Sequence, residues 1–158
     1  MRDVLHAIKN FRQASAELAT SGQPRSEHFG AMAEAGYVAV INLALHDDPT
    51  YSLPDEAGDV RDAHMDYIHI PVQFARPTLA DLKTFMDAMD SYRDRKVWVH
   101  CAANMRVTAF VGLYRVLRQG WDQEPAFQIM NSVWEPNEVW SAFIAEALKG
   151  NLSRGATI

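Results

Sequence analysis

Apolar residues recur along this chain with two different periods. Three short runs are almost continuously apolar and rich in β-branched residues, which is typical of strands covered on both faces; they lie at 37–43, 67–72 and 96–100. Elsewhere apolar residues return at three- and four-residue spacings, which predicts amphipathic helices. The helices predicted in this way span 3–18, 27–34, 55–65, 79–92, 107–119, 124–133 and 136–149.

Capping and stop residues mark several of these helix ends. Ser26 and Thr78 stand where a side chain can cap a helix, and Gly36 and Gly120 follow expected last turns. Strands and helices alternate, which predicts an α/β fold with a mostly parallel central sheet flanked by helices. The 158 residues are expected to form a single domain, 1–158. In such sheets ligands bind beyond the C-terminal ends of the strands.

Composition and charge narrow the range of partners. The formal net charge of −5 argues against broad binding to nucleic acid. No run is long and apolar enough to span a bilayer, so no membrane partner is expected. The N-terminal residues lack the apolar stretch of a signal peptide. We therefore expect a cytoplasmic location by default, or a periplasmic one if a signal peptide has been removed, and leave the oligomeric state open.

A single cysteine, Cys101, limits the chemistry available to the chain. It excludes an intramolecular disulfide and a cysteine-based metal cage. The six histidines show neither HxH nor HxxxH spacing, so we expect no metal site, and nothing in the sequence indicates a cofactor. Cys101 is therefore either an inert core residue or a working thiol.

The sequence around Cys101 favours the working thiol. A predicted strand ends at His100, and a predicted helix begins at 107, so the segment between them is a loop at a helix N-terminus. Backbone N–H groups and the helix dipole stabilise an anion at such a place, so a thiol there ionises more readily. Arg106 can hold two oxygens of a tetrahedral oxyanion with its planar fork. The predicted ligand-binding residues are Ala102, Ala103, Asn104, Met105, Arg106 and Thr108.

This segment resembles the signature of the cysteine-dependent protein phosphatases, a strand ending in His-Cys, five residues, then Arg and Ser or Thr. The closer resemblance is to a bacterial family of small phosphatase-like proteins, the beta-lactamase hydrolase-like phosphatases. Its expected Ser-Gly-Gln-Pro, Ile-Asn-Leu, His-Ile-Pro-Val and His-Cys…Arg motifs occur at 21–24, 41–43, 69–72 and 100–106. The resemblance implies a protein-tyrosine-phosphatase-like fold and a dual-specificity-phosphatase-like hydrolase.

The resemblance also implies roles for single residues. Cys101 would be the nucleophile, Arg106 the anion clamp and His100 a ring that holds the loop through its carbonyl groups. Three features depart from the signature: only four residues separate Cys101 from Arg106, the loop has no glycine, and Val107 replaces the expected hydroxyl. Asn104 is expected to adopt the positive φ that glycine would otherwise take, and Thr108 is a candidate for the missing hydroxyl.

A phosphatase also needs a general acid to protonate the leaving oxygen. The segment after the 67–72 strand contains no carboxylate, and the nearest is Asp81, a candidate acid whose position favours a helix N-terminal charge instead. Four acids follow the 37–43 strand, and we expect each of them to be a solvated loop charge. They are Asp47, Asp48, Asp55 and Glu56.

Four functions remain open from the sequence. The leading one is hydrolysis of a phosphate monoester through a phosphocysteine at Cys101. The short loop has the length seen in rhodanese-like sulfurtransferases, so sulfur transfer through a persulfide is the second. The missing acid favours a third, a non-catalytic module that binds an oxyanion or phosphopeptide. The fourth is a buried core cysteine without chemistry.

Overall fold

The computed structural model describes residues 2–157, with side chains placed from 4 to 150, and contains a five-stranded sheet. The strands are β1 Arg12–Ser15, β2 Leu18–Ser21, β3 Ala39–Asn42, β4 Asp66–His69 and β5 Val97–His100. Their spatial order is β1-β2-β5-β3-β4, and every neighbouring pair is parallel except β1 and β2. The predicted mostly parallel sheet is confirmed, and β5, the strand that precedes Cys101, lies at its centre.

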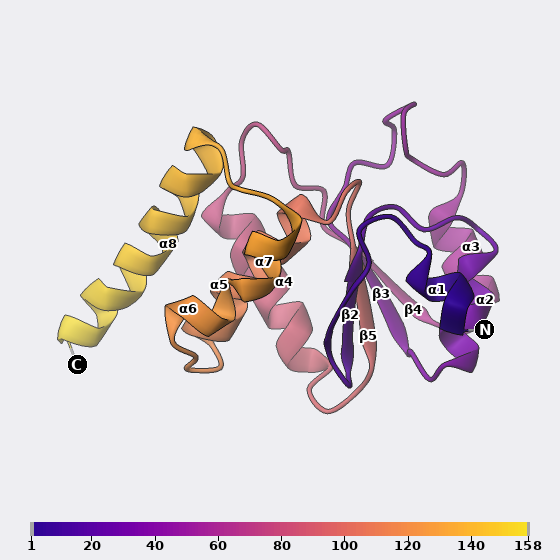
Figure 1. The fold of residues 1–158 in the computed structure, drawn as a ribbon, viewed down its shortest axis with the longest axis horizontal. Coiled ribbons are helices and arrows are strands. Elements are labelled where there is room, and N and C mark those ends of the chain that lie inside the picture. Colours follow the sequence, from indigo (N-terminus) through magenta and orange to yellow (C-terminus); the bar gives the residue numbers. More distant parts are fainter. Residues whose placement is uncertain (1, 158) are drawn as a thin grey trace.

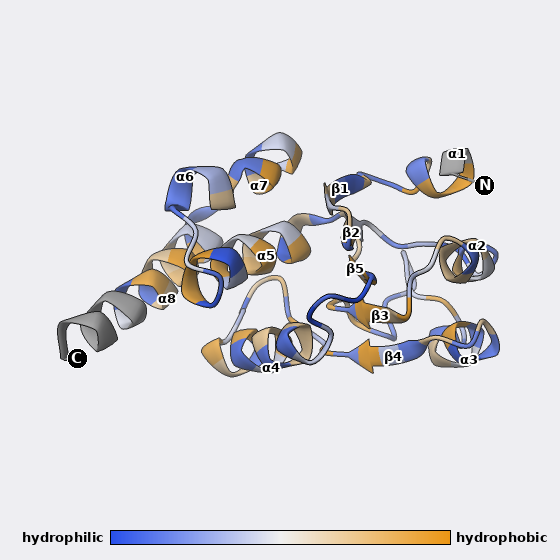
Figure 2. Cartoon of the chain, turned by 90° about the horizontal axis from the view of Figure 1, so that it is seen from below, coloured by the Kyte–Doolittle hydropathy of each residue, from blue (hydrophilic) through white to orange (hydrophobic). Residues whose placement is uncertain are grey.

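Helices cover both faces of this sheet (Figure 1). One group consists of α1 Arg2–His6, α2 His28–Glu34 and α3 Glu56–Asp62. The other consists of α4 Leu79–Ser91, α5 Met105–Leu117, α6 Gln123–Ala126, α7 Gln128–Val133 and α8 Glu138–Thr157. Figure 2 shows the two groups on opposite sides of the strands. No helix among the described residues is long and apolar enough to cross a membrane.

The two faces bury separate cores because side chains alternate along each strand. Trp98 of β5 packs with Phe29 and Met32 of α2 in one core. Val99, the next residue, lies with Phe85 and Phe110 in the other. The continuous apolar runs in the sequence therefore reflect burial on both faces.

Most predicted elements are present, and their ends follow the predicted signals. Thr78 caps α4, its hydroxyl accepting from the Asp81 amide at 3.1 Å. Gly36 and Gly120 follow helix ends at φ values of +100° and +74°. Ser26 does not cap α2; its hydroxyl donates to Asp59 instead, at 2.7 Å.

The predicted helix 3–18 is wrong. Helix α1 ends at His6, the chain turns through Asn10 at a φ of +52°, and β1 and β2 then form an antiparallel edge of the sheet. The side chains of β1 alternate between half-buried and exposed, a period of two that the widely spaced apolar residues of this stretch did not reveal. The predicted helix 124–133 also divides at Phe127 into α6 and α7.

Candidate active site

The loop after β5 leads directly into α5. Asn104 has φ +66° and ψ +12°, so the predicted positive φ at this residue is confirmed. Its side-chain amide nitrogen donates to the Asn10 carbonyl at 2.8 Å and to the Thr20 hydroxyl at 3.0 Å. A left-handed residue at this point turns the chain into the helix, which begins at Met105. The loop is thus a tight turn at a helix N-terminus.

The N-terminal segment holds this loop in shape. The Cys101 amide donates to the Ser21 carbonyl at 3.3 Å, and the Gln23 amide donates to the Ala102 carbonyl at 3.1 Å. The Asn10 side chain donates to the Ala103 carbonyl at 3.0 Å. These bonds give the Ser-Gly-Gln-Pro sequence a function beyond a turn: it supports the loop that follows β5.

Gly22 allows the two segments to approach so closely. A Cβ at this position would lie 2.6 Å from the Ala102 carbonyl oxygen and 3.0 Å from that of Lys9. Both of these atoms belong to backbone, which cannot rotate out of the way. The loop therefore depends on a glycine that directly follows β2 rather than on one of its own.

Cys101 lies at the start of the loop and is only 1% exposed. Such burial is as typical of a core cysteine as of a nucleophile at the bottom of a pocket, so burial alone does not decide between them. The neighbouring Arg106 is the more informative residue.

Arg106 is a buried cation at the N-terminus of α5, 6% exposed. Its Nη1 donates to the Val72 carbonyl at 2.7 Å. The rings of Tyr51 and Phe74 each lie 6.0 Å from its guanidinium carbon. Within the described part of the chain, no carboxylate comes within ion-pair distance of Arg106. Because burying a charge without a partner is costly, this arrangement favours an anionic ligand.

His100 and Glu56 form a buried pair behind the loop. The His100 ring is fully buried, with Nδ1 3.2 Å from the Cys101 carbonyl oxygen and Nε2 2.6 Å from Glu56 Oε2. The contact with the loop carbonyl agrees with the role expected of His100. Glu56, expected as a solvated loop charge, is instead buried in the first turn of α3 and accepts from the Gln23 side chain at 2.7 Å.

The charge of Glu56 is maintained in spite of its burial. Burial alone would raise the pKa of this carboxyl, but the charge of His100 and hydrogen bonds from His100 and Gln23 hold the pKa below its ordinary value. The sequence could not reveal this pair, because 44 positions separate its members. The only signal was an acidic residue just inside a helix that follows a parallel strand.

Two other predicted site residues have structural partners of their own. The Thr108 hydroxyl donates to the Asn104 carbonyl at 2.8 Å and accepts from the Trp134 indole at 3.2 Å. Asp81 lies half-buried in the first turn of α4, where its charge suits the helix dipole. A catalytic role for either residue stays a prediction.

The loop after β3 contributes residues near Arg106 that sequence reasoning did not single out. The Tyr51 ring faces the guanidinium, and the Tyr51 amide donates to the Asp48 carbonyl at 3.3 Å within one turn. Hydrogen bonds from the Thr50 hydroxyl and amide, with a smaller contribution from the charge of Arg106, lower the pKa of Asp48. Asp48 is partly exposed on this turn, in keeping with a loop charge in contact with solvent.

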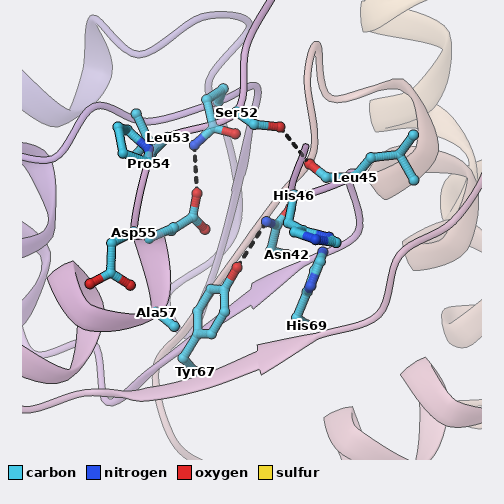
Figure 3. Close-up of a pocket in the computed structure, with 12 residues that line it drawn as sticks. Asn42, Leu45, His46, Ser52, Leu53, Pro54, Asp55, Ala57, Tyr67 and His69 are labelled. Carbon is cyan, nitrogen blue, oxygen red and sulfur yellow. Dashed lines mark hydrogen bonds between the residues drawn. The ribbon is translucent and has the colours of Figure 1, made fainter. Parts of the chain in front are cut away.

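A cavity of about 240 Å³ opens between this loop and β4 (Figure 3). Glu56 lines it together with Asn42, Tyr67 and His69. Asn42 donates to the Tyr67 hydroxyl at 3.0 Å, and burial and the neighbouring charge of Glu56 raise the pKa of Tyr67. Among the described residues, no cluster of three or more His, Cys, Asp or Glu side chains is arranged to hold a metal ion.

Comparisons with known proteins agree with this geometry. Residues 7–140 match the family "DSP-PTPase phosphatase fused to NAD+ Kinase". The chain is 31% identical over 106 residues to the beta-lactamase hydrolase-like proteins of two Xylella fastidiosa strains, Temecula1 and 9a5c. That alignment covers 63% of this chain and 23% of the relatives, so the chain spans about a quarter of their length.

Solved structures of phosphatase-like proteins have the same fold as this chain. A phosphatase-like DUF442 protein of Shewanella putrefaciens CN-32 superimposes with a TM-score of 0.84 and 32% identity, covering 96% of this chain and 99% of the other. The P. aeruginosa protein TpbA, as its C132S variant in complex with pTyr, superimposes with a TM-score of 0.68 and 20% identity, covering 85% and 82%. This second likeness concerns the fold.

The fold and the loop together define a protein-tyrosine-phosphatase-like domain. Within that class, the chain belongs to the family described as "DSP-PTPase phosphatase fused to NAD+ Kinase". The predicted family resemblance, fold and enzyme class are confirmed.

Proposed function

We propose that the chain hydrolyses phosphate monoesters through a phosphocysteine at Cys101. The observation that carries this proposal is the buried guanidinium of Arg106, which lacks an anionic partner among the described residues and lies five positions after the only cysteine. A dianionic phosphoryl group supplies the missing charge and matches the fork of the guanidinium. The helix N-terminus and the loop amides would stabilise its other oxygens.

The reaction would proceed in two steps. The Cys101 thiolate attacks phosphorus, the S–P bond forms, and the P–O bond to the leaving group breaks, so that the leaving oxygen takes the electron pair and a proton. Water then gives a proton to the carboxylate that served as proton donor and attacks phosphorus, the S–P bond breaks, and sulfur regains its electron pair as inorganic phosphate departs. Since phosphotyrosine is bound by the TpbA neighbour, an aryl phosphate is a suitable first substrate.

For the proton donor to the leaving group, we favour Asp48 over Asp81, the candidate from the sequence. Asp48 shares a turn with Tyr51, whose ring faces Arg106, and its carboxylate senses the Arg106 charge. Bound phosphate would raise the affinity of Asp48 for a proton by placing negative charge beside it. Asp81 has no such link to Arg106 among its described contacts.

Substrates with different leaving groups test the proton donor. Asp48→Asn should lower kcat/KM by about 10²-fold for a poor leaving group, such as an alkyl phosphate, and much less for a nitrophenyl phosphate. Asp47→Asn, an exposed neighbour, is the matched control and should match the wild type. If Asp81→Asn alone shows the leaving-group dependence, the proton donor is Asp81.

The reaction itself is tested with p-nitrophenyl phosphate. Wild-type protein should release nitrophenol and form a Cys101-linked phosphate that mass spectrometry detects after acid quenching, while Cys101→Ser should retain its circular dichroism and lose turnover. Phosphate binding without turnover by the wild type would indicate the non-catalytic module. Added sulfur on Cys101 after thiosulfate treatment, again without turnover, would indicate the sulfurtransferase suggested by the four-residue loop.

A further inference from the structure

We propose that Glu56 is a positioning residue that keeps His100 doubly protonated and so promotes ionisation of Cys101. The inference rests on the proposed function, because it assigns a purpose to the thiolate of that reaction. Glu56 lies in α3, and its side chain hydrogen-bonds to Gln23 and His100, so it acts on the loop through the His100 ring. No motif in the sequence connects α3 with the loop.

Counting protons on the His100 ring supports this assignment. The Cys101 carbonyl can only accept a hydrogen bond, so Nδ1, at 3.2 Å, must carry a proton. At Nε2 the partner is Glu56, 2.6 Å away. One proton lies between these two groups, and the pair is either imidazolium with carboxylate or neutral ring with carboxylic acid.

The surroundings of Glu56 select the charged form. The Gln23 side chain donates to Oε1 at 2.7 Å, a bond that strengthens with negative charge on the acceptor. The pKa of Tyr67 on β4 is raised, so its hydroxyl keeps its proton. Hydrogen bonding from this hydroxyl lowers the pKa of Glu56 and so favours the carboxylate. Asp55, His46 and His69 line the same cavity, and the charge of Arg61 on α3 acts on Tyr67. The proton therefore resides on the ring.

This charge distribution favours the thiolate form of Cys101. The imidazolium lies beside the Cys101 backbone, whereas the carboxylate lies on the far side of the ring. Although the pair is neutral overall, its positive end is the one that contacts Cys101, and there it favours a thiolate. Replacing Glu56 by glutamine removes the carboxylate, and a neutral His100 then follows, so the nearby positive charge is lost.

Nitrogen NMR of the histidine rings tests the assignment without any change to the pair. In wild-type protein at neutral pH, both His100 nitrogens should show the shifts and proton couplings of N–H groups. The signals are assigned by their disappearance in His100→Asn. An unprotonated Nε2 in the wild type would overturn the proposal.

Thiolate absorbance tests the consequence. Because Cys101 is the only cysteine, the ultraviolet difference between each protein and its Cys101→Ser counterpart follows this thiolate against pH. Glu56→Gln should lower the ratio of thiolate to thiol at neutral pH about tenfold and move the titration to higher pH. Asp62→Asn, an exposed acid of the same helix, should leave the titration unchanged.

A double variant separates positioning from a general structural effect. If Glu56 acts through the ring, adding Glu56→Gln to His100→Asn should change the titration no further. An undiminished effect of Glu56→Gln in the His100→Asn background, or no effect in the wild-type background, would refute the proposal. These readouts need no turnover, so an inactive protein with the expected titration would remove the phosphatase reaction and leave the Glu56 assignment standing.

Discussion

Asn104 is the residue of the loop whose replacement can be worked through most fully. It holds the left-handed conformation at φ +66° and anchors the loop with two hydrogen bonds, to Asn10 and Thr20. Its other amide atom, Oδ1, is buried without a hydrogen-bond partner, so no bond is lost there on substitution. The effect of Asn104→Ala is therefore the sum of a backbone contribution and two bonds.

The magnitude follows from these parts. Each buried hydrogen bond contributes about 1 kcal/mol, and alanine in the left-handed region costs about 1–2 kcal/mol. We expect Asn104→Ala to lower the free energy of unfolding by roughly 3–4 kcal/mol, which in a chain of this length lowers Tm by roughly 6–16 °C. Asn104→Gly keeps the turn, loses the same bonds and increases the freedom of the unfolded chain, so it should be destabilised by roughly 2–3 kcal/mol.

Urea denaturation gives the stabilities, and calorimetric titration with inorganic phosphate reports on loop shape. Asn104→Gly should keep phosphate affinity within a few-fold of the wild type, whereas Asn104→Ala should lose tenfold or more because the loop cannot close without strain. An alanine variant as stable as the wild type within about 0.5 kcal/mol would refute the reasoning about φ. So would equal phosphate affinity in all three proteins.

The remaining predictions concern the support of the loop, its cation, the helix behind it and the alkaline limit of stability. Gly22→Ala should weaken phosphate binding, measured by the same titration, because its Cβ would collide with backbone at 2.6 Å. Arg106→Lys should reduce phosphate affinity by about tenfold or more, since a point charge replaces the fork; unchanged affinity would exclude Arg106 as the clamp. Gly112→Ala should lower Tm, because the new Cβ would lie 2.3 Å from the Phe127 ring, and the expected loss of about 1–3 kcal/mol exceeds the gain in helix propensity. Burial and a hydrogen bond to Asp90 raise the pKa of Tyr114 to about 12. Its contribution is complete below the unfolded value of 10 and disappears as pH rises through about 12, so Tyr114→Phe should flatten the alkaline fall in stability measured by urea titration.

The central part of the fold was predictable because its signals are local. Continuous apolar runs revealed the strands around β5, and Thr78, Gly36 and Gly120 marked helix ends that depend only on neighbouring residues. Strands β1 and β2 were missed for the opposite reason. β1 is polar and half-exposed, and its pairing with β2 is decided by the sheet rather than by its own pattern.

The candidate site shows the same division. The conformation of Asn104 could be predicted from its residue type. Cys101 and Arg106 could be named as candidate site residues from their spacing. The burial of Glu56 and the approach of the Asp48 turn to Arg106 depend on how separate elements pack, which residue type does not encode. Both acids look like surface charges in the sequence.

The loop after β5 is held by residues that lie about 80 to 94 positions earlier in the chain, and this has a consequence for how the site comes into being. Asn10, Thr20 and the Ser21–Gln23 segment are synthesised long before the residues they hold, and the loop receives its shape only when the two distant stretches meet. Anion affinity is then a late product of folding, gained together with the central sheet. Bound phosphate should accordingly slow hydrogen exchange at residues 20–23 as well as at 101–106, so that a ligand at one place reports on the integrity of both.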